Sequence, residues 1–372
     1  MSRLCSIVVA ALVLAAPAHA AAPPVTARAY VVLNASTGEV LASHGAHARV
    51  PVASLTKLMT VLVARQSALL GKRITVDTSA AEVGESSIHL RRGERITLRD
   101  LIKGALIQSA NDAADAIADG LAPSRASFVA EMNANARELG LDDTHFVRPD
   151  GLDAPGHYSS AWDVTRLAEI SMRDRFVRSV VRERNDTIAG GRRLHTWNDL
   201  LGVFPGLIGV KTGHTGGAGW CEVAAARGHG VTIYATILGS PSRSQRNADL
   251  SALLRWGLSR YRVLRVIATG RTYALAETGY GRAALPLVST TTVRRAVRVD
   301  RSLVARIVVP GAVALPVRSG DRLGSLRVYD ARGRVVAAQP LVAARSVTRP
   351  GIVARVGFYA RRTVHHVLGF FT

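Results

Sequence analysis

Residues 51–60 read PVASLTKLMT, and the interpretation of the whole chain starts from this stretch. Apolar side chains recur after Leu55 with the spacing of one helix face, which predicts a helix from about residue 54 to about residue 70, ended by Gly71. Ser54 and Lys57 are three positions apart, so they lie on the same side of that helix.

The pair Ser54 and Lys57 matches what nucleophilic catalysis by a serine needs. A serine hydroxyl is a weak nucleophile until a base takes its proton, and a lysine can be that base only when it is neutral. Burial and a second nearby cation both lower a lysine pKa. The alternative is an N-cap serine followed by a surface lysine, and the pair alone does not exclude it.

The periodicity on both sides of this helix predicts an α+β fold, with helices packed on a mostly antiparallel sheet. Strands are expected at 29–34, 39–43, 208–211, 219–226 and 231–238, and further helices at 98–119, 124–139, 160–172 and 244–259. We expect this catalytic domain to cover residues 21–262.

The last third of the chain has a different pattern of apolar and turn residues. Short apolar runs alternate with Gly, Pro and Asp turns, which predicts a small all-β domain over residues 263–348. Residues 349–372 have apolar positions at helical steps with arginines between them, which is typical of a basic amphipathic helix. We expect it to lie on an anionic membrane surface, the alternative being a helix docked on its own domain; its arginines exclude a spanning segment.

The first twenty residues have the three parts of a signal peptide. Arg3 supplies the charge, residues 4–16 are apolar, and residues 18–20 read AHA, a small-x-small cleavage pattern. We therefore expect secretion across the cytoplasmic membrane and a peripheral location on its outer, periplasmic or extracellular, face. An uncut membrane anchor is the alternative. After cleavage only Cys221 would remain, which leaves no partner for an intrachain disulfide.

The charge is strongly positive and uneven. The formal net charge is +21, and residues 261–372 contribute +15 of it through arginines alone. No basic cluster is interleaved with stacking aromatic residues, so we expect no nucleic-acid partner.

Two further motifs hold polar side chains suited to chemistry. Ser109-Ala110-Asn111 follows an apolar helical run, and its hydroxyl and amide could relay a proton and hold a substrate amide. Lys211-Thr212-Gly213 lies on a strand that leads into a glycine-rich turn, which suits the carboxylate end of a peptide. Taken singly, the first is equally a polar turn or helix cap, and the second a β-turn with a solvated lysine.

The three motifs, in this order and spacing, resemble the penicillin-recognising serine enzymes, whose signature is Ser-x-x-Lys, Ser-x-Asn and Lys-Thr-Gly. Segments 53–60, 149–161, 198–201 and 209–215 are most similar to the low-molecular-mass penicillin-binding proteins that are serine D-alanyl-D-alanine carboxypeptidases. The resemblance covers about residues 25–260 and continues more loosely beyond. It implies a β-lactamase/transpeptidase-like domain. The region 145–165 lacks the Glu-x-x-Leu-Asn of class A β-lactamases.

The resemblance also implies a role for each motif residue. Ser54 would attack the carbonyl between two terminal D-alanines of a peptidoglycan stem pentapeptide, and β-lactams would acylate Ser54 as mimics of that end. Lys57 would be the base, Ser109 would relay a proton, and Asn111 would bind a substrate amide. Lys211, Thr212 and Arg246 would bind the carboxylate, with Arg243 as a competitor for the role of Arg246. Gly213 lies in the turn of the substrate-binding segment, where the backbone N–H groups of His214 and of Ser54 would form the oxyanion hole. No metal and no cofactor are expected.

Other functions remain open at this stage. A D,D-endopeptidase or a weak β-lactamase would share the fold and differ in small loops. A catalytically silent envelope-binding protein, held by its arginines, is an alternative of another class.

Overall fold

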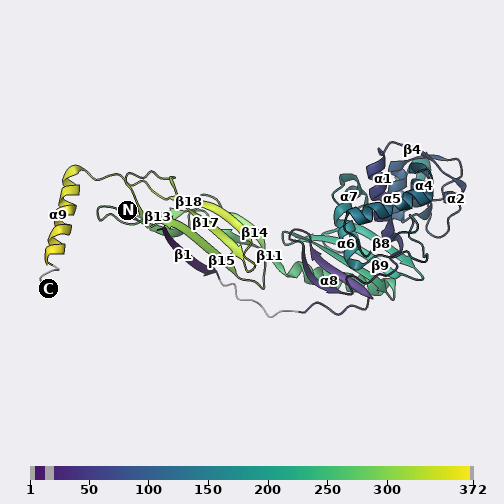
Figure 1. Ribbon diagram of the computed structural model, residues 1–372, viewed down its shortest axis with the longest axis horizontal. Helices are drawn as coiled ribbons and strands as arrows, with labels where there is room; N and C mark the ends of the chain where they lie inside the picture. The colour runs from purple at the N-terminus through teal and green to yellow at the C-terminus, as the bar shows by residue number, and fades with distance from the viewer. Residues whose placement is uncertain (1–4, 13–20, 369–372) are drawn as a thin grey trace. The chain divides into compact units, whose positions relative to one another are not determined.

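The computed structural model describes residues 5–12 and 21–368. Contacts divide the chain into two units, one formed by residues 21–259 and the other by the chain from residue 260 onward together with the strand at 5–12 (Figure 1). Arg3 and residues 18–20, on which the signal-peptide prediction partly rests, lie outside the described residues.

A five-stranded antiparallel sheet organises the first unit. Its order is β3-β2-β10-β9-β8, comprising β3 (Glu39–His44), β2 (Ala29–Asn34), β10 (Val231–Ser240), β9 (Gly219–Gly228) and β8 (Leu207–Thr215). Since β8 has a neighbour on one side only, its residues 211–214 lie at an open edge of the sheet.

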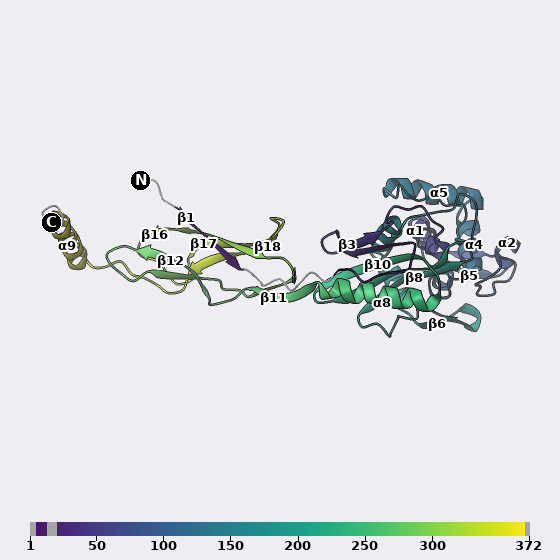
Figure 2. The ribbon, with the colours of Figure 1, turned by 90° about the horizontal axis from the view of Figure 1, so that it is seen from below.

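Helices cover both faces of this sheet. On β10, Ile233 faces Gly257 of α8 (Arg243–Ser259), whereas the Thr236 hydroxyl bonds to Thr165 of α6 (Ala161–Ser171). Residues 233 and 236 point to opposite sides of a strand, so α8 and α6 pack on opposite faces. Figure 2 shows α8 along one face of the sheet, with α1 and α5 beyond the other.

The helical part packs beside α6 around one apolar core. Its elements are η1 (Ala53–Thr56), α1 (Lys57–Ser67), α2 (Thr78–Ala81), α3 (Leu98–Lys103), η2 (Gly104–Gln108), α4 (Asn111–Leu121), α5 (Arg125–Glu138) and α7 (Arg175–Val180). Side chains cap several of these helices, as Thr97 does α3 and Ser124 α5. Two short hairpins, β4 (Arg73–Thr75) with β5 (Arg95–Thr97) and β6 (Asn185–Ile188) with β7 (Arg192–His195), and the turn η3 (Ala189–Gly191) complete the unit.

Two predicted helices differ from the structure. The helix expected to reach residue 70 ends at Ser67, and its first turn, which carries Ser54, is a 3₁₀ turn. The helix expected over 98–119 is broken: a π-helical turn ends at Ser109, whose φ of +61 stops the helix before α4 begins. Both departures lie at the predicted site, where strained backbone is commonly found.

The second unit is all β apart from its last helix. A seven-stranded sheet has the order β1-β15-β17-β18-β13-β12-β16, and β11 (Tyr261–Ile267) pairs with β14 (Val293–Arg298) beside it. The sheet contains β1 (Cys5–Leu12), β12 (Thr272–Thr278), β13 (Leu285–Val288), β15 (Leu303–Pro310), β16 (Ala312–Val313), β17 (Arg322–Asp330) and β18 (Val335–Ala343). Thus residues 5–12, the middle of the predicted signal peptide, pair antiparallel with β15 here.

The chain's last helix, α9 (Ile352–Leu368), presents apolar side chains to solvent. Ile352, Val353 and Val356 are mostly exposed, and Phe358 and Tyr359 contact the Tyr280 ring of the same unit. Among the described residues, no helix has both the length and the hydropathy needed to cross a bilayer.

Candidate active site

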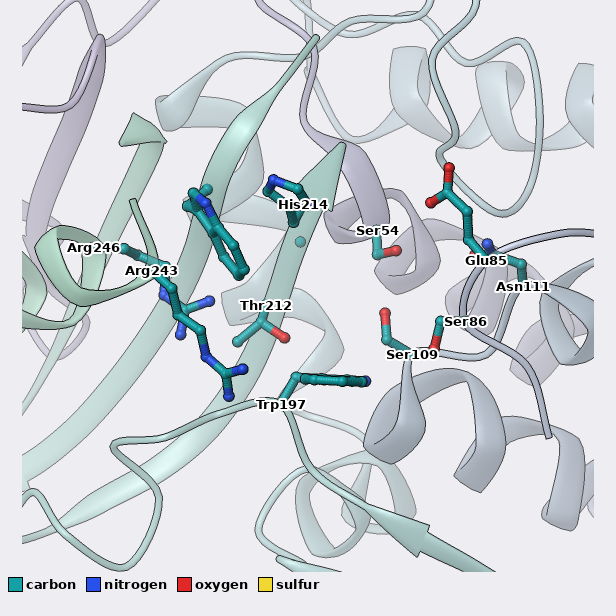
Figure 3. A pocket seen from close by; sticks show the side chains of 12 residues that line it. Ser54, Glu85, Ser86, Ser109, Asn111, Trp197, Thr212, His214, Arg243 and Arg246 are labelled. Atoms are coloured by element: carbon teal, nitrogen blue, oxygen red, sulfur yellow. The ribbon is translucent and has the colours of Figure 1, made fainter. Parts of the chain in front are cut away.

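A cavity of about 230 Å³ gathers side chains from all three motifs (Figure 3). Predicted site residues on its lining are Ser54, Ser109, Asn111, Thr212, Gly213, His214 and Arg246. Lys57 and Lys211 are absent from the lining because both are buried behind it, each within reach of a lining hydroxyl. The geometry therefore pairs one serine with one lysine on each side of the cavity.

The first pair is Ser54 with Lys57. Residues three apart in a 3₁₀ turn eclipse each other, and Lys57 Nζ lies 2.8 Å from Ser54 Oγ. The amine also donates to Asn111 Oδ1 at 2.7 Å and to the Asp150 carbonyl at 2.6 Å. These two acceptors occupy both N–H bonds of a neutral amine, so its lone pair is directed at the Ser54 hydroxyl, as a general base requires.

Burial lowers the pKa of Lys57 from 10.5 to about 8, although the carboxylates of Asp150 and Asp115 oppose the shift. The Lys57 and Lys211 amines repel each other when both are charged, which disfavours the state with both protonated. Burial, and then repulsion from Lys57, hold the pKa of Lys211 well below its ordinary value.

The second pair is Ser109 with Lys211. The left-handed backbone at Ser109 aims its hydroxyl at the cavity, where Lys211 Nζ donates to Ser109 Oγ at 2.8 Å. Lys211 also donates to its neighbour's carbonyl, Thr212 O, at 2.8 Å. The Thr212 hydroxyl, rather than the Lys211 amine, is what β8 presents to the cavity.

Gly213 allows strand β8 to approach the nucleophile closely. A Cβ on Gly213 would lie 3.0 Å from Ser54 N and 3.1 Å from Val52 O, which is tighter than side-chain atoms tolerate. The next residue, His214, stacks its ring on Trp220 with 4.0 Å between centroids. This brings the backbone of residues 213–214 next to the backbone of Ser54, as an oxyanion hole built from two N–H groups needs.

The cationic end of the cavity is held by a buried ion-pair cluster. Arg246, only 1% exposed, lies 3.1 Å from Glu222 Oε2 and 3.3 Å from Asp199 Oδ2. Arg243 Nε donates to the same Asp199 carboxylate at 2.7 Å, and the guanidinium lies over the Trp197 ring. Burial raises the pKa of Glu222 to about 7. Arg243 and Arg246, which the sequence analysis treated as competitors for carboxylate binding, both line the cavity.

The floor of the site depends on the turn at residues 148–152. Arg148 donates two hydrogen bonds of 2.6 Å to the Asp150 carboxylate, which fixes the Asp150 carbonyl that Lys57 uses. Gly151, at φ +85, passes so close to η1 that a Cβ there would lie 2.2 Å from Ala53 O. His157 supports the same region by a 2.8 Å contact between Nε2 and Thr56 Oγ1, and its burial lowers its pKa to about 4.

Sequence reasoning missed several residues of this site. Glu85, Ser86, Trp197 and Trp220 line the cavity, and Glu222 supports it from behind. None has a motif spacing, since each reaches the site from a loop or a strand far along the chain. The acidic residue Glu222 within an otherwise apolar strand was the one available signal, because a buried carboxylate needs a partner.

Within residues 5–12 and 21–368, no three His, Cys, Asp or Glu side chains come together in a way that could hold a metal ion.

A serine touching a buried lysine amine, with a second serine–lysine pair across a cavity at the edge of an antiparallel sheet, defines a serine-type peptidase of the hydrolase class. The model of the D-alanyl-D-alanine carboxypeptidase family matches residues 16–242, and the chain belongs to this family. The predicted family and the α+β fold with an all-β second part are confirmed.

Full-length relatives support this assignment. The chain is 30% identical to D-alanyl-D-alanine carboxypeptidase DacF of Bacillus subtilis strain 168, covering 88% of this chain and 87% of the relative. It is 29% identical to D-alanyl-D-alanine carboxypeptidase DacA of Escherichia coli strain K12, covering 93% and 90%. These matches extend beyond the catalytic unit into the β-rich second unit.

Solved structures show the same folds. The Streptomyces K15 DD-transpeptidase matches with a TM-score of 0.61 and 31% identity, covering 64% of this chain and all of that chain. Penicillin binding protein 5 from Haemophilus influenzae matches with a TM-score of 0.65 over 89% of this chain and all of that one. At 24% identity, the second match bears on the fold alone.

Proposed function

We propose that the chain is a penicillin-binding serine carboxypeptidase that removes the terminal D-alanine from peptidoglycan stem peptides ending in D-Ala-D-Ala. The observation that carries this proposal is the double pairing of Ser54 with Lys57 and of Ser109 with Lys211, both at 2.8 Å across one cavity. The family and the names of the relatives support the same substrate.

Acylation starts at Ser54. Neutral Lys57 takes the hydroxyl proton while Ser54 Oγ forms a bond to the carbonyl carbon between the two D-alanines. The backbone N–H groups of Ser54 and His214 stabilise the negative charge that develops on the carbonyl oxygen. Asn111, fixed by the Lys57 amine, holds the amide on the acyl side through its Nδ2 group.

The leaving group is bound on the other side of Ser54. Its carboxylate accepts from the Thr212 hydroxyl and faces Arg243 and Arg246, the cationic end of the cavity. When the C–N bond breaks, Ser109 donates its proton to the departing amine, while its oxygen accepts a hydrogen bond from Lys211 Nζ. The proton that Lys57 took from Ser54 replaces the one lost by Ser109, which leaves Lys57 neutral again. Water, activated by Lys57, then hydrolyses the ester on Ser54 and releases the shortened peptide.

A test follows directly from the covalent step. Purified protein should release D-alanine from a D-Ala-D-Ala peptide and should take up labelled penicillin on Ser54. Ser54→Ala should abolish both while its thermal unfolding stays close to that of the wild type, because the hydroxyl is removed from the wall of an open cavity and leaves no void in the apolar core. A protein that does neither is a silent envelope-binding protein. Rapid release of hydrolysed penicillin would instead favour a β-lactamase, and cleavage of cross-linked dimers an endopeptidase.

We further propose that α9 attaches the protein to the outer face of the cytoplasmic membrane after secretion. The exposed apolar side chains of Ile352, Val353 and Val356 would enter the headgroup region, and the arginines of the helix would face anionic lipid. The proposed organisation is a signal peptide at 1–20, a catalytic domain at 21–262, a β domain at 263–348 and the helix at 349–372.

A further inference from the structure

The two ends of the active-site cavity carry opposite charges. Arg243 and Arg246 lie at one end, and Glu85 lies at the other, beside Asn111 and with Ser54 between them (Figure 3). Glu85 is the one acidic side chain on the lining of this cavity. In a chain with a formal net charge of +21, a carboxylate placed at the mouth of the site gives that end a sign opposite to most of the surface.

The Glu85 carboxylate is available to a ligand. It is exposed, and among the described residues no hydrogen bond or ion pair reaches it. Other acidic residues at the site are already engaged: Asp199 pairs with Arg243 and Arg246, and Glu222 pairs with Arg246 at 3.1 Å.

The backbone around Glu85 is fixed to the catalytic machinery. Asn111 N donates to Ser86 O at 2.7 Å, and Asn111 Nδ2 donates to Gly84 O at 3.1 Å, so one residue holds both neighbours of Glu85. Ser86 Oγ adds a bond to Gln108 O at 2.8 Å. Glu85 itself has a φ of +66, a left-handed conformation that glutamate rarely adopts without such restraints.

The chemistry of the reaction sets the direction of the substrate. The terminal carboxylate must face the arginines, and the scissile carbonyl must reach Ser54. The acyl part of the peptide then extends away from the arginines, toward Asn111 and Glu85. The side chain nearest to Glu85 therefore belongs to the residues that precede the two D-alanines.

We infer that Glu85 is a specificity residue that binds a free aliphatic amine on the side chain of the residue preceding D-Ala-D-Ala, as in a peptide with a lysine or another diamino acid there. This inference rests on the proposed carboxypeptidase function. An ammonium group on a flexible stem pairs with the Glu85 carboxylate, so each charged end of the substrate faces a cavity end of the opposite charge.

The test compares two peptides that differ only in this charge: Nα-acetyl-L-Lys-D-Ala-D-Ala and its Nα,Nε-diacetyl form. With the full chain, kcat/KM for D-alanine release should favour the free amine by about three- to tenfold, the range of a partly solvated charge-assisted contact. Added salt should reduce the preference. Glu85→Gln should bring the ratio of the two kcat/KM values close to one, and Glu85→Lys should invert it.

Glu82→Gln is the matched control. Glu82 is an exposed glutamate three residues earlier that does not line the cavity, so this variant makes the same change in net charge and should keep the preference. The inference is overturned if the wild type treats both peptides alike, or if Glu85→Gln retains the preference, while D-alanine release itself persists. If neither peptide is cleaved and penicillin is not bound, the proposed function fails and this inference falls with it.

Discussion

If Lys57 is the base, as proposed, its pKa should set the pH dependence of acylation. Lys57 is fully buried, and its pKa is lowered to about 8, so below this pH the amine is protonated and cannot accept the Ser54 proton. The second-order rate of acylation by a fluorescent penicillin should rise about tenfold per pH unit up to about pH 8 and then level off. Lys57→Ala should lose about a hundredfold or more at every pH. A rate that is constant from about pH 6 to about pH 9 would contradict this assignment.

Gly151 is a second residue on which the site depends. In Gly151→Ala the new Cβ would meet Ala53 O at 2.2 Å, directly under the turn that carries Ser54. Gly156→Ala is the matched control, because Gly156 has a similar φ of +81 but its nearest neighbour lies 3.9 Å away. Both variants pay the backbone strain, and only the first adds a steric clash.

We therefore expect Gly151→Ala to lower the free energy of unfolding by about 1–3 kcal/mol more than Gly156→Ala does. It should also slow acylation, since Ser54 and the Asp150 carbonyl must both move. Urea unfolding and penicillin uptake measure the two effects. Equal losses in the two variants would show that the close approach is not a constraint.

At the scale of elements, α9 is the one whose role can be separated from catalysis. Two variants should fail to sediment with vesicles that contain anionic phospholipid. One is the chain ended after Arg349, and the other is the double variant Ile352→Ser with Val353→Ser. The reason is that both remove exposed apolar surface from the helix. Binding by the wild type should weaken as salt is raised, since arginines contribute part of it.

The control for this experiment is Val335→Ser, which removes an exposed apolar side chain from β18 and should bind vesicles as the wild type does. If the chain without α9 still sediments with the vesicles, the proposal that α9 attaches the protein to the membrane is wrong.

The whole molecule consists of two units with separate apolar cores, one within residues 29–238 and the other within residues 267–347. Domains with their own cores commonly unfold as separate transitions, and a ligand bound to one folded unit stabilises that unit. Calorimetry should show two transitions, and acylation by penicillin should shift only one of them. In Ser54→Ala, penicillin should shift neither transition. A single transition that moves as one on acylation would mean that the units unfold together.

Much of the fold could be predicted from the sequence because periodicity reports burial. The strands of the first sheet and the helices α5, α6 and α8 lie close to the predicted ranges, since each buries apolar side chains: α5 and α6 in the main core, and α8 on the other face of the sheet. The break at Ser109 could not be predicted in the same way. The apolar pattern runs continuously through residues 98–119, and the left-handed turn is imposed by contacts with Lys211 and the loop at residues 84–86.

The sequence by itself determined the family and predicted the catalytic set, because the three motifs place two serines, two lysines and an asparagine in the order typical of the penicillin-recognising serine enzymes. Only the tertiary structure decided how they work. It showed that Ser54 lies in a 3₁₀ turn directly before Lys57, the first residue of α1, so that the amine meets the hydroxyl, and that burial is the main cause of the lowered Lys57 pKa. It also brought Glu85, Trp197 and Glu222 to the site. These are effects of burial and of contacts between distant segments, which a linear pattern of residues does not contain.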